Sequence, residues 1–168
     1  MIEVAVIAEA PWPGDWDILA ERACRAALAR SAQLEWATSP AVIEVSVRLT
    51  SNDEVRTLNR DYRQKDKLTN VLSFPMIQPD LLASVASNSD DGEVLLGDIV
   101  LAHGVCAAEA GERGVTVEAH AQHLIVHGML HLLGHDHMND AEAAAMEAIE
   151  RDALAALGLH DPYPVRED

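Results

Sequence analysis

The spacing of apolar residues along the chain predicts an alternation of strands and helices. Ile2 to Ala8 and Val42 to Thr50 alternate apolar and polar positions and are rich in β-branched residues, which indicates half-buried β-strands. Apolar segments bounded by turn residues predict two more strands, Asn70 to Pro75 and Val94 to Ala102. Helical spacing and capping residues predict helices at Asp15 to about Trp36, Ser51 to about Tyr62, about Gly104 to Glu112, Val117 to Leu133, and Asn139 to Leu157.

This order of elements predicts a protein of the α+β class, in which a small mixed β-sheet is covered by helices. A chain of 168 residues has the usual length of one domain and can bury a core without disulfides, so residues 1–168 are interpreted as a single domain. Residues 76–92 are rich in serine and aspartate and predict a mobile surface loop. Residues 159–168 predict a loosely held tail.

The charge of the chain limits the partners that its surface can bind. Aspartate and glutamate number 28 against 12 lysines and arginines, and the net charge of -16 argues against an extensive nucleic-acid footprint. Many of the basic residues nevertheless fall within one short segment. Charge alone favours a solvated helix face there over a phosphate-binding one. The residues of this basic segment are Arg56, Arg60, Arg63, Lys65 and Lys67.

The cysteines and the chain's apolar segments indicate a cellular compartment. Cys24 and Cys106 lie far apart and have the spacing neither of a metal site nor of a disulfide framework. The first residues contain acids and prolines where a signal peptide needs basic residues and a long apolar run. The longest apolar segment, Leu124 to Leu133, is interrupted by histidines and is too short to span a bilayer. We therefore expect a soluble, cytoplasmic protein without a membrane partner.

Histidines are concentrated between His123 and His137. His127 and His131 are four residues apart, so a helix places both on one face. Gly134 permits the left-handed turn that ends helices, and His137 can then fold back toward the first two. Three converging imidazoles favour a single catalytic zinc ion, which typically takes three protein ligands and leaves one position open. This histidine helix is therefore expected to be the central, metal-binding helix, although nickel or copper would also bind such ligands.

Neighbouring polar residues leave alternatives open. His120 and His123 continue the same stripe, and His123 could pair with His127, but only the end of the helix gives a third ligand room to return. We therefore interpret His120 and His123 as residues that line or support the site, and His135 as exposed in the turn. Asp136 either accepts a hydrogen bond from a ligand imidazole or belongs to the turn alone.

The chemistry of this site should differ from that of a zinc peptidase. In the H-E-x-x-H helix of those enzymes the glutamate is the general base, and Gly128 occupies that position here. A metal can instead activate water and polarise a phosphoryl oxygen, and a phosphodiester substrate also needs cations for its developing charge. The basic segment supplies candidates. For a phosphodiester, attack by water and attack by a neighbouring hydroxyl of the substrate are both compatible with these residues.

Several segments resemble the YbeY endoribonuclease (rRNA maturation factor) family. HGMLHLLGHDH resembles the family's pattern H-G-x-L-H-L-x-G-[Y/H]-D-H, and LNRDYRQKDKLTNVLSFP, LLGDIVLA and EAHAQHLIVHG resemble three more of its blocks. The resemblance runs from about Val42 to Tyr163 in the family's order. It implies a mixed sheet with helices, and one zinc ion held by the residues that match His127, His131 and His137. The family's functionally important arginine matches Arg63.

The resemblance also implies an activity and partners. It implies a single-strand-specific, zinc-dependent endoribonuclease that matures ribosomal RNA, notably the 3′ end of the small-subunit RNA, and takes part in ribosome quality control. The expected partners are ribosomal RNA and the small ribosomal subunit or its proteins. Arg63 is expected to bind the scissile phosphate, with Lys65 and Lys67 as further phosphate contacts. Two alternatives stay open: a non-enzymatic assembly factor whose metal is structural, and a metallohydrolase that acts on another substrate.

Overall fold

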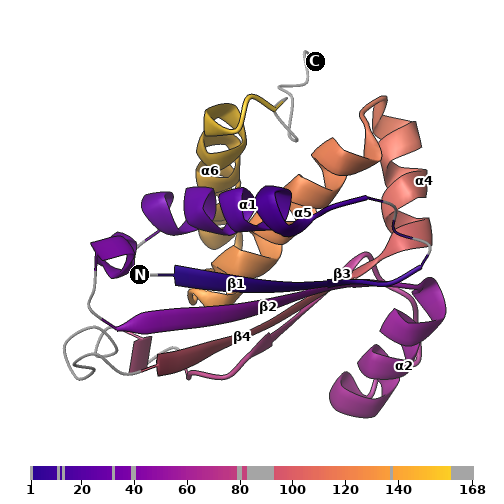
Figure 1. Ribbon diagram of the computed structural model, residues 1–168, viewed down its shortest axis with the longest axis horizontal. Helices are drawn as coiled ribbons and strands as arrows, with labels where there is room; N and C mark the ends of the chain where they lie inside the picture. Colours follow the sequence, from indigo (N-terminus) through magenta and orange to yellow (C-terminus); the bar gives the residue numbers. More distant parts are fainter. Residues whose placement is uncertain are drawn as a thin grey trace.

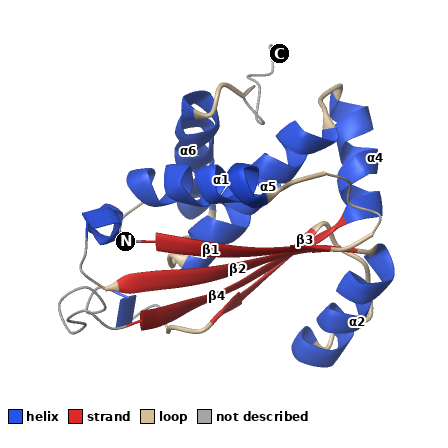
Figure 2. Ribbon diagram, in the orientation of Figure 1, coloured by secondary structure: helices blue, strands red, loops and turns tan. Residues whose placement is uncertain are grey.

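The chain folds around a four-stranded sheet with the strand order β1-β2-β4-β3 (Figure 2). β1 (Ile2–Ala8), β2 (Val42–Thr50) and β4 (Glu93–Ala102) are parallel, and β3 (Val71–Pro75) is an edge strand antiparallel to β4. The predicted α+β class with a mixed sheet is thus confirmed. The computed structural model describes residues 2–10, 12, 14–31, 33–38, 41–78, 81–82, 93–136 and 138–159.

Helices cover the two faces of the sheet unequally (Figure 1). α1 (Asp17–Arg30) and α5 (Val117–Leu132) pack on one face, and α6 (Asp140–Ala156) packs against both of them. α2 (Asn52–Arg63) lies on the opposite face, and α4 (His103–Arg113) contacts α5 and α2 at one end of the sheet. Part of the sheet face beside α2 is therefore left without a covering helix.

One predicted helix is interrupted. The segment from Asp15 to about Trp36 forms α1 and then a separate 3-10 helix, η1 (Leu34–Thr38). Ser31 ends α1 because its hydroxyl donates to the Leu28 carbonyl at 2.8 Å and accepts from the Gln33 N–H at 3.1 Å. These local hydrogen bonds replace the next helical turn, so the single long helix expected from apolar spacing is wrong.

Two predicted segments fall mostly outside the described residues. Of the loop at 76–92, residues 76–78 and 81–82 are described, and of the tail at 159–168, Leu159 is described. Their mobility, and the interpretation of the chain as one domain, stay predictions. Within the described part of the chain, no helix combines the length and the apolar character needed to cross a membrane.

α5 is the central helix of the fold. Buried residues surround almost its whole circumference, as expected for a helix enclosed by other elements. Thr116 caps its start by accepting from the Ala119 N–H at 3.0 Å, and Gly134 (φ 92°) adopts the left-handed conformation just after its end. The predicted glycine stop is confirmed, and it fixes where the histidine face of α5 ends.

Gly128 sets how closely α5 approaches the sheet. A Cβ at this position would lie 2.8 Å from Ile99 Cγ2 on β4 and 3.0 Å from Ser73 Oγ on β3. Because glycine avoids that clash, Ser73 Oγ can donate a hydrogen bond to the Gly128 carbonyl at 3.1 Å. The backbone next to His127 is thereby held against the edge strand. A larger residue at position 128, such as the glutamate of a zinc peptidase, would push α5 away from the sheet.

Candidate active site

His127 and His131 lie on one face of α5, as predicted, and their side chains meet. Their Nε2 atoms are 3.1 Å apart, and their ring centroids are 4.6 Å apart. Two nitrogens bound to one tetrahedral zinc ion, each about 2.0–2.1 Å from the metal, lie about 3.3 Å from each other. The spacing and the chemistry of this donor pair therefore fit a shared metal ion.

A buried carboxylate holds the first of these histidines. Glu150 on α6, whose side chain is 1% exposed, lies 2.5 Å from His127 Nδ1 through Oε1 and 3.2 Å from His123 Nε2 through Oε2. An ionised carboxylate only accepts hydrogen bonds, so the proton of a neutral His127 stays on Nδ1. The Nε2 lone pair is then directed toward His131, where a metal would bind. His123 joins this arrangement as a supporting residue, which agrees with its predicted role.

Glu150 was not predicted from the sequence. It lies on a different helix from the histidines, so no local spacing connects it to them. The available signal was its position on the buried stripe of α6, which also contains Met146, Ala153 and Leu154. A glutamate on such a stripe is unusual, because a buried carboxylate needs a partner.

The turn after α5 differs in part from expectation. His137, the predicted third ligand, lies outside the described residues, and among the described ones no group of three or more metal-binding side chains is placed to hold an ion. The third ligand therefore stays a prediction. His135 is half-buried rather than exposed, its Nε2 has no hydrogen-bond partner among the described residues, and burial lowers its pKa. A hydrogen bond from a ligand imidazole to Asp136 also stays a prediction. The structure shows Glu150 as a carboxylate partner of His127.

Arg63 is the last residue of α2, one position beyond the end expected near Tyr62, and its side chain turns toward the sheet. Its Nη2 donates to the Ser73 carbonyl, and its guanidinium carbon lies 5.5 Å from the centroid of the Phe74 ring. Ser73 is the residue whose hydroxyl bonds to Gly128, next to His127. A single residue of β3 therefore connects Arg63 to the helix that carries the histidine pair.

The rest of the basic segment is arranged differently. Arg56 pairs with Asp66 at 2.9 Å and Arg60 with Asp61 at 3.2 Å, and all four side chains are more than half exposed. Exposed pairs of this kind add little stability but neutralise much of the local positive charge. These two arginines fit the predicted solvated helix face, whereas Arg63 makes its contacts with β3.

His120 belongs to a separate polar cluster at the other end of α5. Its ring is 2% exposed, and its Nε2 lies 2.9 Å from Glu109 Oε1 on α4. Asn70, which precedes β3, donates to the same oxygen at 3.0 Å. Burial lowers the pKa of His120 although Glu109 opposes this effect. Burial raises the pKa of Glu109, but hydrogen bonds from His120 and Asn70 outweigh it, so the net pKa is lowered.

This cluster predicts acid destabilisation at mildly acidic pH. Because the folded-state pKa of His120 is lowered, the unfolded chain binds a proton below about pH 6.5 that the folded chain does not bind. The free energy of unfolding should therefore fall as the pH drops from about 6.5. The pKa of Glu109 is also lowered, so Glu109 stabilises the folded state, and this stabilisation is lost only below its ordinary pKa near 4.5. Urea unfolding of metal-free protein at several pH values between 7 and 5 measures how steeply the free energy of unfolding depends on pH. This dependence should be weaker in His120→Asn than in the wild type. An equal dependence in both proteins would contradict the assignment.

Comparison with known proteins assigns the chain to a family. The family model described as endoribonuclease YbeY matches residues 16–158. A protein of Rhizorhabdus wittichii named endoribonuclease YbeY is 59% identical over 170 residues, covering 100% of both chains. A second protein of that name, from Sphingopyxis alaskensis, is 58% identical over 165 residues, covering 97% of this chain and 98% of its own.

A solved structure supports the fold independently. The solution structure of TM1509 from Thermotoga maritima matches with a TM-score of 0.54 at 21% sequence identity, and the match covers 97% of this chain and 100% of that one. At this identity the likeness concerns the fold alone. The family model and the two relatives span nearly all of the described chain, including both histidines and Arg63. The chain therefore belongs to the YbeY endoribonuclease family.

Proposed function

We propose that this protein is a zinc-dependent endoribonuclease that cleaves single-stranded RNA during ribosomal RNA maturation, including the 3′ end of the small-subunit RNA. The observation that carries the proposal is the pair of imidazole nitrogens of His127 and His131, 3.1 Å apart and next to the strand that anchors Arg63. The endoribonuclease name of its relatives supplies the substrate class.

The histidines of this chain would hold the metal ion. His127 and His131 supply Nε2 lone pairs, and His137 is the proposed third ligand. Bound zinc would supply a Lewis acid for a phosphoryl oxygen and lower the pKa of a water molecule. Glu150 keeps the His127 proton on Nδ1 and thereby leaves Nε2 free to donate its lone pair.

Arg63 would bind the scissile phosphate. A guanidinium has five N–H donors, and the bond to the Ser73 carbonyl uses one of them. The remaining donors can bind two phosphate oxygens, and the positive charge stabilises the negative charge that develops on them during cleavage. The anchor on β3 restricts the side chain before substrate arrives, so less conformational freedom is lost on binding.

A peptide substrate fits the site less well. Asn70 and Met76 form backbone hydrogen bonds with β4. Residues of an antiparallel strand alternate between bonding to the neighbouring strand and facing away from it, so the backbone polar groups of Ser73 and Pro75 point away from β4, toward the open edge of the sheet. The Ser73 carbonyl is taken by Arg63, and Pro75 has no N–H to donate. An extended peptide would therefore find few free backbone groups along this edge. Gly128 also leaves the position of a peptidase's general base empty.

The test is cleavage of an end-labelled single-stranded RNA by protein of measured metal content. We expect metal-replete protein to cut, chelated protein to stop, and one equivalent of zinc to restore cleavage, with duplex RNA as the control substrate. A 2′,3′-cyclic phosphate on the product would identify the 2′-hydroxyl as nucleophile, and a linear phosphate would identify water. Equal cleavage by replete and chelated protein would contradict the proposal.

Glu150→Gln should weaken zinc binding by about 10- to 100-fold, because an amide can donate to Nδ1 and so no longer fixes the His127 tautomer. Titration of the metal-free protein with zinc against a chromophoric chelator measures the affinity. Glu147→Gln, one turn earlier on α6, is the matched control and should bind zinc like the wild type. Equal zinc affinities for Glu150→Gln and the wild type would show that Glu150 has no role in metal binding.

A second candidate is a ribosome-assembly factor whose metal is structural. The net charge of -16 and the ion pairs of Arg56 and Arg60 favour it, because they reduce the surface available for RNA alone. Co-sedimentation with small ribosomal subunits, together with no cleavage by metal-replete protein, would support this candidate. A role in ribosome quality control is proposed for either case.

We also propose a cytoplasmic location. Cys24 and Cys106 are free and buried, and burial raises the pKa of each thiol to about 12, which keeps it protonated. Two protonated thiols without a disulfide suit a reducing compartment, where the RNA substrate would also be found.

A further inference from the structure

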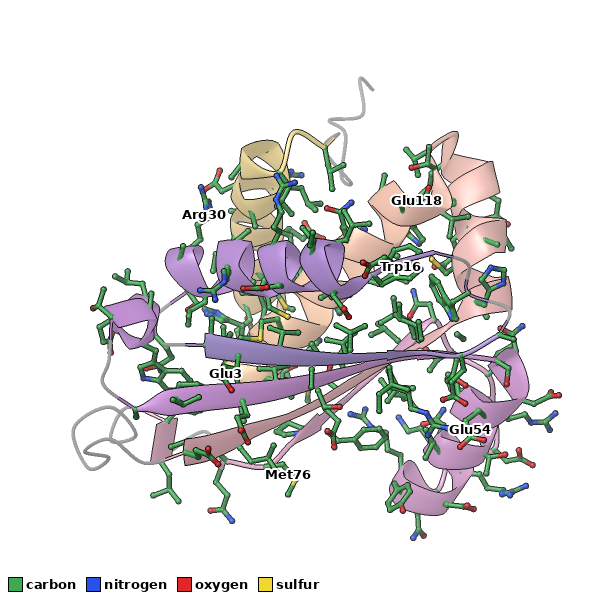
Figure 3. All side chains as sticks on the ribbon, in the orientation of Figure 1. Glu3, Trp16, Arg30, Glu54, Met76 and Glu118 are labelled. Carbon is green, nitrogen blue, oxygen red and sulfur yellow. The ribbon has the colours of Figure 1, made fainter. Side chains whose placement is uncertain are left out.

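A groove lies on the face of the sheet opposite the histidine helix, beside α2. It has a volume of about 460 Å³. Leu58 and Tyr62 of α2 line it on one side, together with Phe74 of β3 and Met76, which directly follows β3. Figure 3 shows Met76 on the side of the sheet that carries α2. The volume falls within the range of small-molecule sites. Arg48 and Asp98 form part of a polar side of the same groove.

Two large side chains of this groove are exposed. Tyr62 is 72% exposed and Met76 is 59% exposed, although other residues of the groove belong to an apolar cluster or pack against it, namely Val100, Leu58 and Phe74. The Tyr62 ring meets Phe74 edge to face, with ring centroids 5.9 Å apart and an interplanar angle of 70°. This contact holds the tyrosine ring in place while most of its surface stays accessible. An aromatic ring held in this way can stack on a flat ligand at a low cost in conformational entropy.

The groove adjoins the proposed phosphate site through Phe74, which lines the groove and contacts Arg63. Tyr62 and Arg63 are neighbours in sequence, and both contact the same ring: the Arg63 guanidinium carbon lies 5.5 Å from the Phe74 centroid and the Tyr62 ring lies 5.9 Å from it. A phosphate on Arg63 and a flat group on Tyr62 would therefore both lie beside the Phe74 ring. Charge complementarity agrees, because the anion meets the guanidinium and the uncharged base meets the aromatic ring.

We propose that Tyr62, supported by Phe74, is a stacking platform for an unpaired RNA base next to the scissile phosphate. This inference rests on the proposed function and extends it, because it gives a physical reason for a single-strand preference. A base in a duplex is already stacked and paired, so it cannot lie on Tyr62 without being unstacked. Stacking recognises the flat face that all bases share, so the platform accepts every base.

The test is RNA affinity read by rapid-mixing fluorescence anisotropy, before cleavage occurs, on the full metal-loaded protein with a fluorescein-labelled single-stranded RNA. Loss of one base–aromatic stack corresponds to a weakening of at least about 5-fold, and this is expected for Tyr62→Ala. Tyr62→Phe keeps the ring and should bind within about 2-fold of wild type. Ile18→Ala is the matched control, since Ile18 is 66% exposed and lies on α1.

Two further readings separate stacking from charge and from protein docking. The dependence of affinity on salt should be unchanged in Tyr62→Ala, because no phosphate contact is lost, and should decrease in Arg63→Gln. RNA carrying 5-iodouridine should photo-cross-link to the peptide that contains Tyr62.

Wild-type RNA affinity in Tyr62→Ala, while the wild type cleaves RNA, would overturn the platform alone. The same result with lost binding to ribosomal subunits would overturn it in favour of protein docking. A wild type that neither binds nor cleaves RNA would overturn the platform and the proposed function together.

Discussion

Replacing His131 with alanine is expected to abolish zinc binding and RNA cleavage together. His131 supplies one of the two nitrogens that lie 3.1 Å apart, so its loss would remove a proposed metal ligand rather than a supporting contact. Zinc affinity should fall by more than the roughly 10- to 100-fold that loss of a supporting residue costs. Metal analysis after gel filtration and cleavage of end-labelled RNA measure the two effects on the same sample.

His103→Ala is the matched control for this experiment. His103 begins α4, and its ring contacts Trp12 with centroids 5.0 Å apart, away from the histidine pair. It should retain zinc and cleave RNA at the wild-type rate. If His131→Ala kept its zinc and its cleavage, the histidine pair would not be the metal site. If it lost zinc but still cleaved RNA, zinc would not be required for cleavage.

Arg63→Gln is expected to keep zinc and to lose cleavage by about 100- to 1,000-fold, the usual effect of removing one donor that stabilises transition-state charge. Glutamine is shorter and uncharged, so it cannot hold a phosphate in a bidentate manner. The reduction should appear in kcat, because the developing charge is larger in the transition state than in the bound substrate. Single-turnover cleavage with saturating protein measures this step.

Arg60→Gln provides the comparison for Arg63→Gln. Both arginines are on α2, but Arg60 is exposed and paired with Asp61 at 3.2 Å. Its replacement removes the same charge from the same helix, so a general electrostatic effect would appear equally in both variants. Equal cleavage rates for Arg63→Gln and Arg60→Gln would show that Arg63 does not act on the scissile phosphate.

Features encoded by local spacing were predictable from the sequence. The strand pattern of Val42 to Thr50 and the helical pair of His127 and His131 depend on neighbours along the chain, and the structure has both. The start of α2 after Ser51 and the turn at Gly134 were also predictable, because capping residues act within a few positions.

Features that depend on contacts distant in sequence were not predictable. Glu150 reaches His127 from another helix, and the anchor of Arg63 on Ser73 depends on the position of β3. The burial of His135 depends on how the turn after α5 packs. The break at Ser31 is local, but it results from competition between side-chain and backbone hydrogen bonds, which apolar periodicity does not report.

The placement of Glu150 on α6 also has a consequence for biosynthesis. His127 and His131 are translated before α6, and the carboxylate that fixes the His127 proton follows His127 by 23 residues. A nascent chain that has exposed only the histidines has a His127 imidazole without a fixed tautomer, on a helix whose covering partner is missing. Zinc binding with full affinity at the proposed site would therefore be reached only after α6 has emerged and docked against α1 and α5. Chains terminated before residue 150 would lack this carboxylate, so we expect them to bind zinc more weakly than the full chain.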